Sequence, residues 1–367
     1  MSEIRHNWSK EEILDIYNKP LMELLYEAAT VHRKHHDPNT VQVSTLLSIK
    51  TGGCPEDCGY CPQAARYHTN IEGNDLMSVQ QVKAQALRAK SSGSSRVCMG
   101  AAWRNVKDGE EFDQVLEMVR TINKLDMEVC CTLGMITENQ AKRLAEAGLY
   151  AYNHNLDTSE EYYKEVISTR GYEDRLETIN NVRKTNVTVC SGGIIGMGEK
   201  IEDRAGMLVA LSTLDPQPES VPINALVAVE GTPMEEEKPI EIWEMIRMVA
   251  TTRIVMPETQ VRLSAGRTQM SREGQAMCFF AGANSIFAGD KLLTTPNPDV
   301  NEDMEMFKML GLNPQKPFVK KSQPESLDSK ESSVLPLGEK PKWSRPGHVI
   351  ERNEQAKQKA KILKASE

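Results

Sequence analysis

Apolar and polar positions follow two different periods along the chain. Near the start, Ser9 and Glu12 have the spacing of a helix capping box, and the apolar residues that follow recur at helical intervals as far as Leu25. Pro20 lies inside this stretch and predicts an interruption of the helix. From Val41 onward, short β-branched runs alternate with amphipathic stretches, which is the pattern of parallel βα units.

The number of these units predicts the architecture. Eight runs have the composition of strands, and they begin at Val41, Ser95, Met127, Leu149, Asn186, Glu219, Gln260 and Asn284. Helical patterns lie between them, among others at 79–90, 110–124, 138–147 and 240–252. The simplest closed arrangement of such units is a (β/α)8 barrel of the TIM type. We therefore expect an α/β fold with a helical extension at 1–40, the barrel at 41–315 and a charged, disordered tail at 316–367.

Composition limits the partners of the protein. The chain has 367 residues, a net charge of -8 and a pI near 5.6, so it lacks the basic face of a nucleic-acid binder. No run reaches the roughly 20 apolar residues of a membrane helix. The first residues, MSEIRHNWSKEE, lack the apolar core of a signal peptide. We expect a cytoplasmic protein that binds neither nucleic acid nor membrane, with its eight cysteines as thiols and several of them as metal ligands.

Three of the cysteines form a compact motif. Cys54, Cys58 and Cys61 lie within TGGCPEDCGYCPQ, directly after the first predicted strand, where a barrel carries its active site. A 4Fe–4S cluster takes four thiolates, so a loop with three leaves one iron open to an external ligand. The amino and carboxylate groups of S-adenosylmethionine (SAM) suit that position. Glycines permit a tight loop, and Tyr60 supplies an aromatic wall beside the last cysteine.

A zinc site is the alternative for this motif. It requires a fourth ligand and usually a pair of CxxC knuckles, which the sequence does not contain. The Cys-x3-Cys-x2-Cys spacing, with an aromatic residue before the last cysteine, resembles the signature of the radical SAM superfamily. That resemblance implies how a radical is made, and by itself it names no substrate.

A second group of cysteines is spread over the predicted strands. Cys98, Cys190 and one of the neighbours Cys130 and Cys131 lie at comparable depths in three strands, and Arg262 lies in a fourth. Each cysteine alone is explained by core packing. If they point inward together they could hold a second cluster, and because side chains alternate along a strand, only one of the two neighbours can take part. A buried arginine also requires a partner, which suggests an anion nearby.

Polar side chains are expected at the barrel mouth. In YAYNHNLDTS, alternation places Asn153, Asn155 and Asp157 on one face of the fourth strand, and Asn224 lies in the sixth. The alternative is a solvent-exposed strand end. Amides donate and accept hydrogen bonds, which suits a urea group with its carbonyl and two N–H groups. The stretch SGGIIGMGE lacks the spacing of a dinucleotide-binding fingerprint, so we expect its backbone to approach SAM instead.

Longer segments resemble the biotin synthase family. They span residues 8–315 and read RVCMGAAWR, Cys-x-TLG, YNHNLDTS, VCSGGI-x-G-x-GE, ESVPIN, VRLSAGR, AMCFFAGANSIF and LLTTPNP. Beside a 4Fe–4S cluster on the first motif, the resemblance implies a 2Fe–2S cluster held by Cys98, Cys130, Cys190 and Arg262. A guanidinium has no ordinary lone pair to give, so the arginine ligand comes from the resemblance alone. The family has no need of Cys131, and we expect Cys278 to lie in the core.

The resemblance also implies the ligand contacts. The substrate is dethiobiotin, which has a ureido ring and a carboxylate tail. The residues implied to bind it are Asn153, Asn155 and Asn224, with Thr294 and Thr295 at the carboxylate. The residues implied to bind SAM are Tyr60, Asp157 at the ribose hydroxyls and Arg175 at the carboxylate. For Arg175 the alternative is a surface ion pair, and for the two threonines it is a helix cap.

The implied reaction is radical sulfur insertion by a sulfurtransferase. SAM is cleaved to a 5′-deoxyadenosyl radical, hydrogen is removed from dethiobiotin, and sulfur from the 2Fe–2S cluster completes biotin. The implied partners are an external electron donor, the iron–sulfur assembly machinery and a second copy of the chain in a homodimer. The rivals are another radical SAM enzyme, such as a mutase, and a non-catalytic iron–sulfur carrier. The second cysteine group argues against the mutase, and the amides and the three-cysteine loop argue against the carrier.

Overall fold

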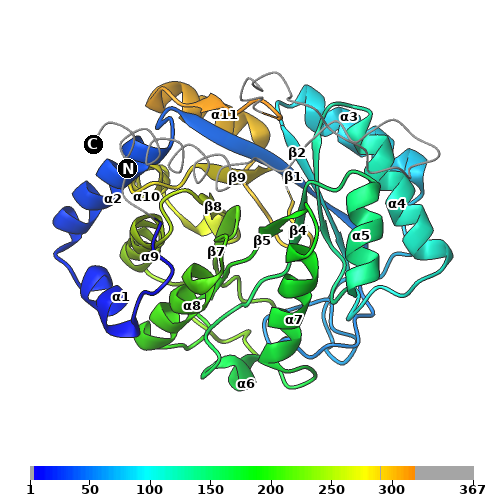
Figure 1. Ribbon diagram of the computed structural model, residues 1–367, viewed down its shortest axis with the longest axis horizontal. Coiled ribbons are helices and arrows are strands. Elements are labelled where there is room, and N and C mark those ends of the chain that lie inside the picture. Colours follow the sequence, from blue (N-terminus) through cyan, green and yellow to red (C-terminus); the bar gives the residue numbers. More distant parts are fainter. Residues whose placement is uncertain (1–3, 290, 319–367) are drawn as a thin grey trace, which may run out of the picture.

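The structure is a computed structural model in which residues 4–289 and 291–318 are described. Figure 1 shows strands in the interior with helices around them. The tail expected from residue 316 lies outside the described residues, except for its first three positions. None of the described helices combines the length and the apolar character that a membrane crossing requires.

The strands close into a barrel. Their bounds are β1 Thr40–Lys50, β2 Arg96–Ala101, β3 Glu128–Thr132, β4 Ala151–Asn153, β5 Thr188–Cys190, β6 Gly193–Ile195, β7 Ser220–Ala225, β8 Gln260–Leu263, β9 Ser285–Ala288 and β10 Asn313–Pro314. The order β1-β2-β3-β4-β5-β7-β8-β9 is parallel throughout, and β9 pairs with β1 to close the ring. This confirms the predicted eight-stranded barrel. In addition, β6 pairs with β7 and β10 pairs with the start of β1.

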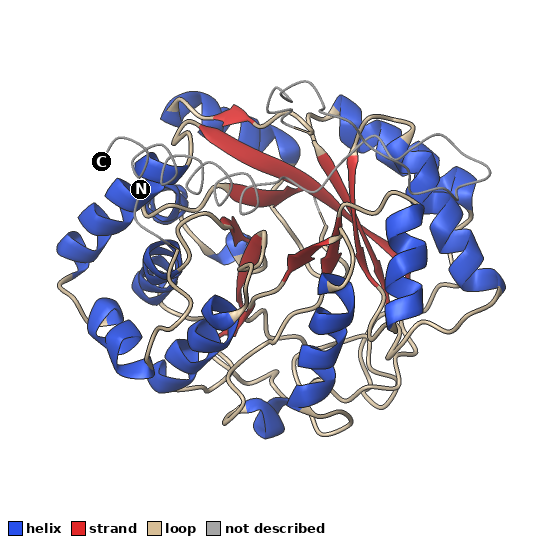
Figure 2. Cartoon of the chain, in the orientation of Figure 1, coloured by secondary structure: helices blue, strands red, loops and turns tan. Residues whose placement is uncertain are grey.

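Helices cover the outside of the barrel (Figure 2). Their bounds are α1 Lys10–Tyr17, α2 Leu21–His35, α3 Val79–Ser91, α4 Glu110–Asn123, α5 Glu138–Glu146, α6 Tyr163–Val166, α7 Tyr172–Arg183, α8 Ile201–Thr213, α9 Ile242–Val255, α10 Arg272–Phe280 and α11 Val300–Leu310. The predicted capping box is present, because the Ser9 side chain and the Glu12 side chain each accept the other's backbone N–H. Pro20 immediately precedes α2, so the predicted interruption is confirmed.

Charged and sulfur-bearing side chains line the barrel interior in layers. Alternation puts Arg96, Cys98 and Gly100 on one face of β2, from the start of the strand to its end. On β3, Glu128 and Cys130 are the register partners of Arg96 and Cys98. The charges therefore lie at the floor of the barrel, which is the amino-terminal end of its strands. The cysteines lie one layer nearer to the carboxyl ends, where barrels carry their active sites.

The fourth and fifth strands differ from the prediction. β4 ends at Asn153, so Asn155 and Asp157 lie in the following loop, and the prediction that all three share a strand face is wrong. Asp157 also has a φ of 68°, a left-handed conformation that an extended strand does not contain. The fifth predicted strand is shorter than expected, because β5 ends at Cys190, and a separate short strand, β6, follows from Gly193. A Cβ atom on Gly192 would lie 2.1 Å from the Pro222 carbonyl oxygen, so only glycine permits this approach.

The last described residues cover the barrel floor. In the β10–β1 pairing, Asn313 lies opposite Thr40. Beyond it, the backbone N–H of Phe318 donates to the Glu128 carboxylate at 3.1 Å, and the Phe318 ring packs edge-on against Tyr150. The layer of buried charge is thus covered by the chain's own segment after α11.

Candidate active site

The loop after β1 presents the three-cysteine motif at the carboxyl end of the barrel. Cys58 is buried, and Cys54 and Cys61 are partly exposed. The Cys54 N–H donates to the Gln63 carbonyl at 3.0 Å and the Cys61 N–H donates to the Cys58 carbonyl at 2.9 Å, which folds the motif into tight turns. Gly52 has a φ of 75°, a conformation that favours glycine, where the chain leaves β1.

The three thiols lie close enough to influence one another. Burial, together with the neighbouring Cys58 and Cys54, raises the pKa of Cys61 to about 12. Burial likewise raises the pKa of Cys58 to about 11. As thiolates these groups require a cationic partner, and a metal cluster supplies one. No three His, Cys, Asp or Glu side chains of the described residues are arranged to hold a single metal ion. Three thiols on one loop are the donor set of a cluster with one open iron, whereas a zinc site requires a fourth protein ligand.

Two acidic residues inside the motif anchor the loop to the chain after α6. The Asp57 carboxylate accepts from the backbone N–H groups of Ser168 and Thr169 at 2.9 and 3.0 Å. The neighbouring Glu56 is buried, accepts from the Thr169 hydroxyl and lies 3.8 Å from the Arg170 guanidinium. These contacts hold the cysteines against the rest of the barrel mouth.

Replacing Asp57 with asparagine should lower the stability of the folded protein at neutral pH but not in acid. Burial opposes ionisation, but hydrogen bonds from Ser168 and Thr169 prevail and lower the pKa of Asp57 from 3.8 to about 2. A lowered folded-state pKa stabilises the fold above the unfolded value, and this stabilisation is lost as the pH falls from about 5 towards 2. We expect Asp57→Asn to lower the free energy of unfolding at pH 7 by about 1 kcal/mol, because solvent screens this site.

Urea titrations of the two proteins at several pH values measure this effect. The difference between them should shrink steadily below about pH 5. A difference of the same size at neutral and acidic pH would show that the charge of Asp57 is not its cause.

The strands bring the second group of cysteines together inside the barrel. Cys98, Cys130 and Cys190 are buried, and the Cys130 thiol shares hydrogen bonds with both of the other two. Cys131 lies on the opposite face of β3, where burial raises its pKa. Of the two neighbours, the structure therefore places Cys130 in the group.

Arg262 faces the same group from β8. Its Nη1 lies 3.8 Å from the Cys190 sulfur. A hydrogen bond from Cys130 lowers the pKa of Cys190, and the Arg262 charge lowers it further, against the opposing effect of burial. The group that faces this arginine inside the barrel is thus the Cys190 sulfur, whose pKa is lowered. Three converging thiols, one of them acidified, and a guanidinium fit a second iron–sulfur cluster.

Two polar residues that hold Arg262 were not predicted from the sequence. Gln42 and Ser285 accept hydrogen bonds from its guanidinium at 2.9 and 2.8 Å. Both are buried, on β1 and β9. Alternation along these strands would have identified them as polar residues that point into the barrel.

Asp157 and Arg175 form a buried ion pair beside the first motif. The Arg175 side chain is 3% exposed, so the surface-ion-pair alternative is wrong. The Tyr60 hydroxyl donates to Asp157 Oδ2 at 2.8 Å, and Arg175 donates to the same oxygen. Arg175 also donates to the Asn155 carbonyl at 2.5 Å and to the Tyr163 hydroxyl at 2.8 Å. The loop after β4 and helix α7 thus place a fixed carboxylate next to the cysteine motif.

The three predicted asparagines lie near the carboxyl end of the barrel, Asn153 and Asn224 at the ends of β4 and β7 and Asn155 in the loop after β4. Asn153 Nδ2 donates to the Cys190 sulfur at 3.3 Å and to Asn155 Oδ1 at 3.1 Å. Asn224 donates to the Gly193 carbonyl at 2.9 Å, at the start of β6. All three are partly exposed, so their amides reach the space at the barrel mouth.

The two predicted threonines lie in the loop between β9 and α11. Thr294 and Thr295 are partly buried. Leu293 rests on the carboxyl end of β2, since a Cβ atom on Gly100 would lie 2.7 Å from it. Helix α11 is capped by the Asp299 side chain, so the helix-cap alternative for the threonines is wrong.

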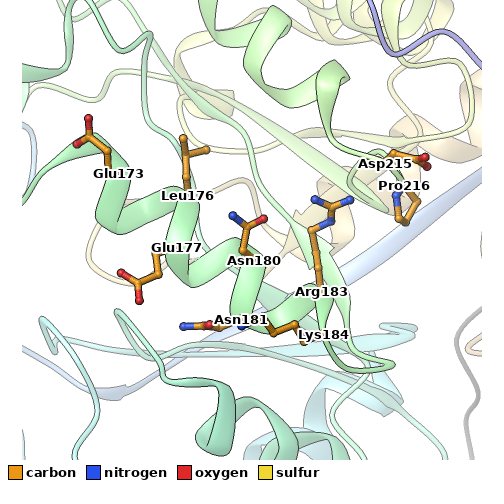
Figure 3. A pocket seen from close by; sticks show the side chains of 9 residues that line it. All are labelled: Glu173, Leu176, Glu177, Asn180, Asn181, Arg183, Lys184, Asp215 and Pro216. Carbon is orange, nitrogen blue, oxygen red and sulfur yellow. The ribbon is translucent and has the colours of Figure 1, made fainter.

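Two further features lie away from the site. Cys278 is buried in α10, as expected of a core residue. A cavity of about 750 Å³ opens on the outer surface between α7 and the turn at Asp215 and Pro216 (Figure 3). It is lined by residues such as Leu176 and Asn180, and by none of the predicted site residues.

Known sequences resemble this chain over nearly its full length. Residues 48–211 match the radical SAM superfamily, and residues 222–313 match the biotin and thiamin synthesis associated domain. A biotin synthase of Flavobacterium psychrophilum is 88% identical, covering 96% of this chain and 98% of that protein. A biotin synthase of Flavobacterium johnsoniae is 86% identical, covering 98% and 99%. The mitochondrial biotin synthase of Arabidopsis thaliana is 58% identical, covering 88% and 85%.

Solved structures share the fold at low identity. Methylornithine synthase (PylB) superposes with a TM-score of 0.72 at 17% identity, covering 84% of this chain and 94% of that one. The hydrogenase maturase HydG superposes with a TM-score of 0.71 at 17% identity, covering 83% and 72%. At this identity the similarity shows the barrel and nothing about the substrate.

Proposed function

This chain belongs to the biotin synthase family, and we propose that its two cysteine groups hold the two iron–sulfur clusters of that chemistry. The chain is a radical SAM enzyme, a sulfurtransferase that converts dethiobiotin to biotin. The proposed ligands of the 4Fe–4S cluster are Cys54, Cys58 and Cys61, and those of the 2Fe–2S cluster are Cys98, Cys130, Cys190 and Arg262. When bound, the clusters supply the electron for SAM cleavage and the sulfur for insertion.

One series of contacts between the cysteine groups is the main support for this proposal. It runs through Cys190, Asn153, Asn155, Arg175, Asp157 and Tyr60, and Tyr60 directly precedes Cys61. A substrate bound along this series lies within reach of both groups. Radical formation and sulfur transfer can then act on one bound molecule.

We assign SAM to Tyr60, Asp157 and Arg175. The bonds that Asp157 accepts from Tyr60 and Arg175 both end on Oδ2, which leaves Oδ1 for the ribose hydroxyls. Two bonds to one carboxylate oxygen fix its orientation before SAM arrives, so little ordering remains at binding. The Arg175 charge also attracts the SAM carboxylate.

We assign dethiobiotin to the amides and the loop after β9. Asn155 Oδ1 accepts from Asn153 and from the Gly192 N–H at 3.2 Å, so its Nδ2 is directed to the ureido carbonyl. The second N–H of the Asn224 amide is available to donate to the same ring. Thr294 and Thr295 donate to the carboxylate tail, and their loop keeps water from the radicals.

The proposal includes partners beyond the substrates. SAM cleavage consumes an electron, so an external electron donor acts on the enzyme, and iron–sulfur assembly machinery loads the clusters. We place the enzyme in the cytoplasm as a homodimer, in line with the family resemblance.

Anaerobic reconstitution tests the proposed function. The full chain, loaded with iron and sulfide, is given SAM, dithionite and dethiobiotin, and products are measured by mass spectrometry. We expect biotin together with 5′-deoxyadenosine and methionine. Deoxyadenosine without biotin would contradict the substrate assignment, and neither product with both clusters present would contradict the enzyme assignment.

A further inference from the structure

We propose that Gln42 and Ser285 are positioning residues that aim the Arg262 guanidinium at Cys190, and that a buried charge network beneath them holds Gln42 in place. This inference rests on the proposed function, because it concerns the arginine proposed as a cluster ligand. The residues at the barrel floor take no part in the reaction itself, and their role is to position Arg262.

Each hydrogen bond among Arg262, Ser285 and Gln42 has only one possible donor. A guanidinium only donates, so the Ser285 hydroxyl accepts from Arg262 Nε at 2.8 Å. The single Ser285 proton is then donated to Gln42 Oε1 at 3.1 Å. Gln42 Oε1 also accepts from Arg262 Nη2 at 2.9 Å. Two of the three guanidinium nitrogens are thereby held, and the third, Nη1, is the one directed at Cys190.

The plane of the guanidinium is held as well. The Phe287 ring lies over Arg262, with 4.7 Å between the guanidinium carbon and the ring centroid. Arg262 is 1% exposed, so water does not compete for its donors. Neighbouring protein groups therefore set the position, plane and direction of this long side chain.

Gln42 is itself held by a carboxylate. Its Nε2 faces Glu128 Oε2 at 3.4 Å, which fixes the amide with Oε1 towards Arg262. Gln42 is 2% exposed and Glu128 is 4% exposed, so this contact lies in the barrel interior. If the amide turned over, its NH2 group would face the guanidinium and its oxygen would face the carboxylate, and both contacts would be repulsive.

Glu128 is held by charges across the floor. Arg96 Nε donates to Glu128 at 2.8 Å, and its two terminal nitrogens donate to Glu219 at 3.2 and 2.9 Å. Arg96 is fully buried, and its guanidinium also lies 4.8 Å from the centroid of the Tyr150 ring. A buried arginine that binds two carboxylates has little freedom to move, so the network forms a rigid base under Gln42.

A pair of variants at the Arg262 contacts tests this inference. Gln42→Met removes the three amide contacts to Arg262, Ser285 and Glu128 at nearly constant length, and Ser285→Ala removes one hydroxyl with little risk to folding. Both proteins are reconstituted as full chains. Their clusters are examined by Mössbauer and resonance Raman spectroscopy, and the rate at which a chelator removes each cluster is measured. We expect the second cluster of Gln42→Met to show an altered spectrum and to be lost about tenfold faster, the effect of one hydrogen bond to a charged group.

The first cluster and a matched variant serve as controls. The 4Fe–4S spectrum should be unchanged in both variants. Gln260→Met makes the same replacement on β8, in a side chain whose Oε1 has no hydrogen bond among the described residues, and should leave the second cluster as in the wild type. If Gln42→Met fails to fold, the spectrum and lifetime of the second cluster in Ser285→Ala alone test the inference. Wild-type spectra and lifetimes in both variants would overturn the inference, whereas a wild-type protein that binds only one cluster would overturn the proposed function with it.

Discussion

Replacing Cys130 with alanine is expected to abolish biotin formation while the first motif keeps its cluster. Cys130 contacts both Cys98 and Cys190, so its loss removes the central thiol of the second group. The residues proposed to bind SAM lie at the barrel mouth and are untouched. We expect iron content to fall by about the two irons of the second cluster, biotin to fall to background, and SAM cleavage to persist. Iron analysis, Mössbauer spectroscopy and mass spectrometry of the products measure these three quantities.

Cys131→Ala is the matched control, because it makes the same change one residue along the same buried strand. Its side chain lies on the other face of β3, so both clusters and sulfur insertion should be retained. The cost should be about 1 kcal/mol of unfolding free energy, from the loss of one buried sulfur atom. Equal loss of activity in the two variants would contradict the assignment of Cys130, and loss of both clusters in Cys130→Ala would indicate a folding role.

Replacing Arg175 with methionine is expected to destabilise the apoprotein by about 3–5 kcal/mol, the usual cost of breaking a buried ion pair. The change leaves the Asp157 carboxylate buried without its counter-charge and removes the donors to Asn155 and Tyr163. Because Asp157 and Arg175 are the proposed SAM contacts, we also expect SAM cleavage to be lost. Urea denaturation under reducing conditions measures the stability, and deoxyadenosine formation measures the cleavage.

Two further proteins separate these effects. Arg272→Met breaks an exposed pair with Glu305 and should cost less than about 1 kcal/mol. The double variant Asp157→Asn with Arg175→Met removes both charges and should recover part of the stability, but not SAM cleavage. A loss of stability in Arg175→Met no larger than in Arg272→Met would argue against a buried pair.

The site could be predicted from the sequence only where its residues are close along the chain. Cys54, Cys58 and Cys61 lie on one loop, so their spacing alone placed three thiols together after the first strand. The same reasoning was wrong for Asn155 and Asp157, because it extended the fourth strand through a residue in a left-handed conformation. Alternation holds only as long as the backbone stays extended.

By itself, the sequence determined the barrel and the radical chemistry. The spacing of apolar positions and the cysteine motif on one loop are both local properties of the chain. Spacing left Cys130 and Cys131 open, and the tertiary structure places Cys130, the one that the resemblance implied, beside Cys190. Only the tertiary structure decided that Arg175 is buried against Asp157 and that Gln42 reaches Arg262. These contacts depend on register between strands and on which face of a helix meets the barrel. Register and packing are set by the whole closed sheet, and no short stretch of sequence encodes them.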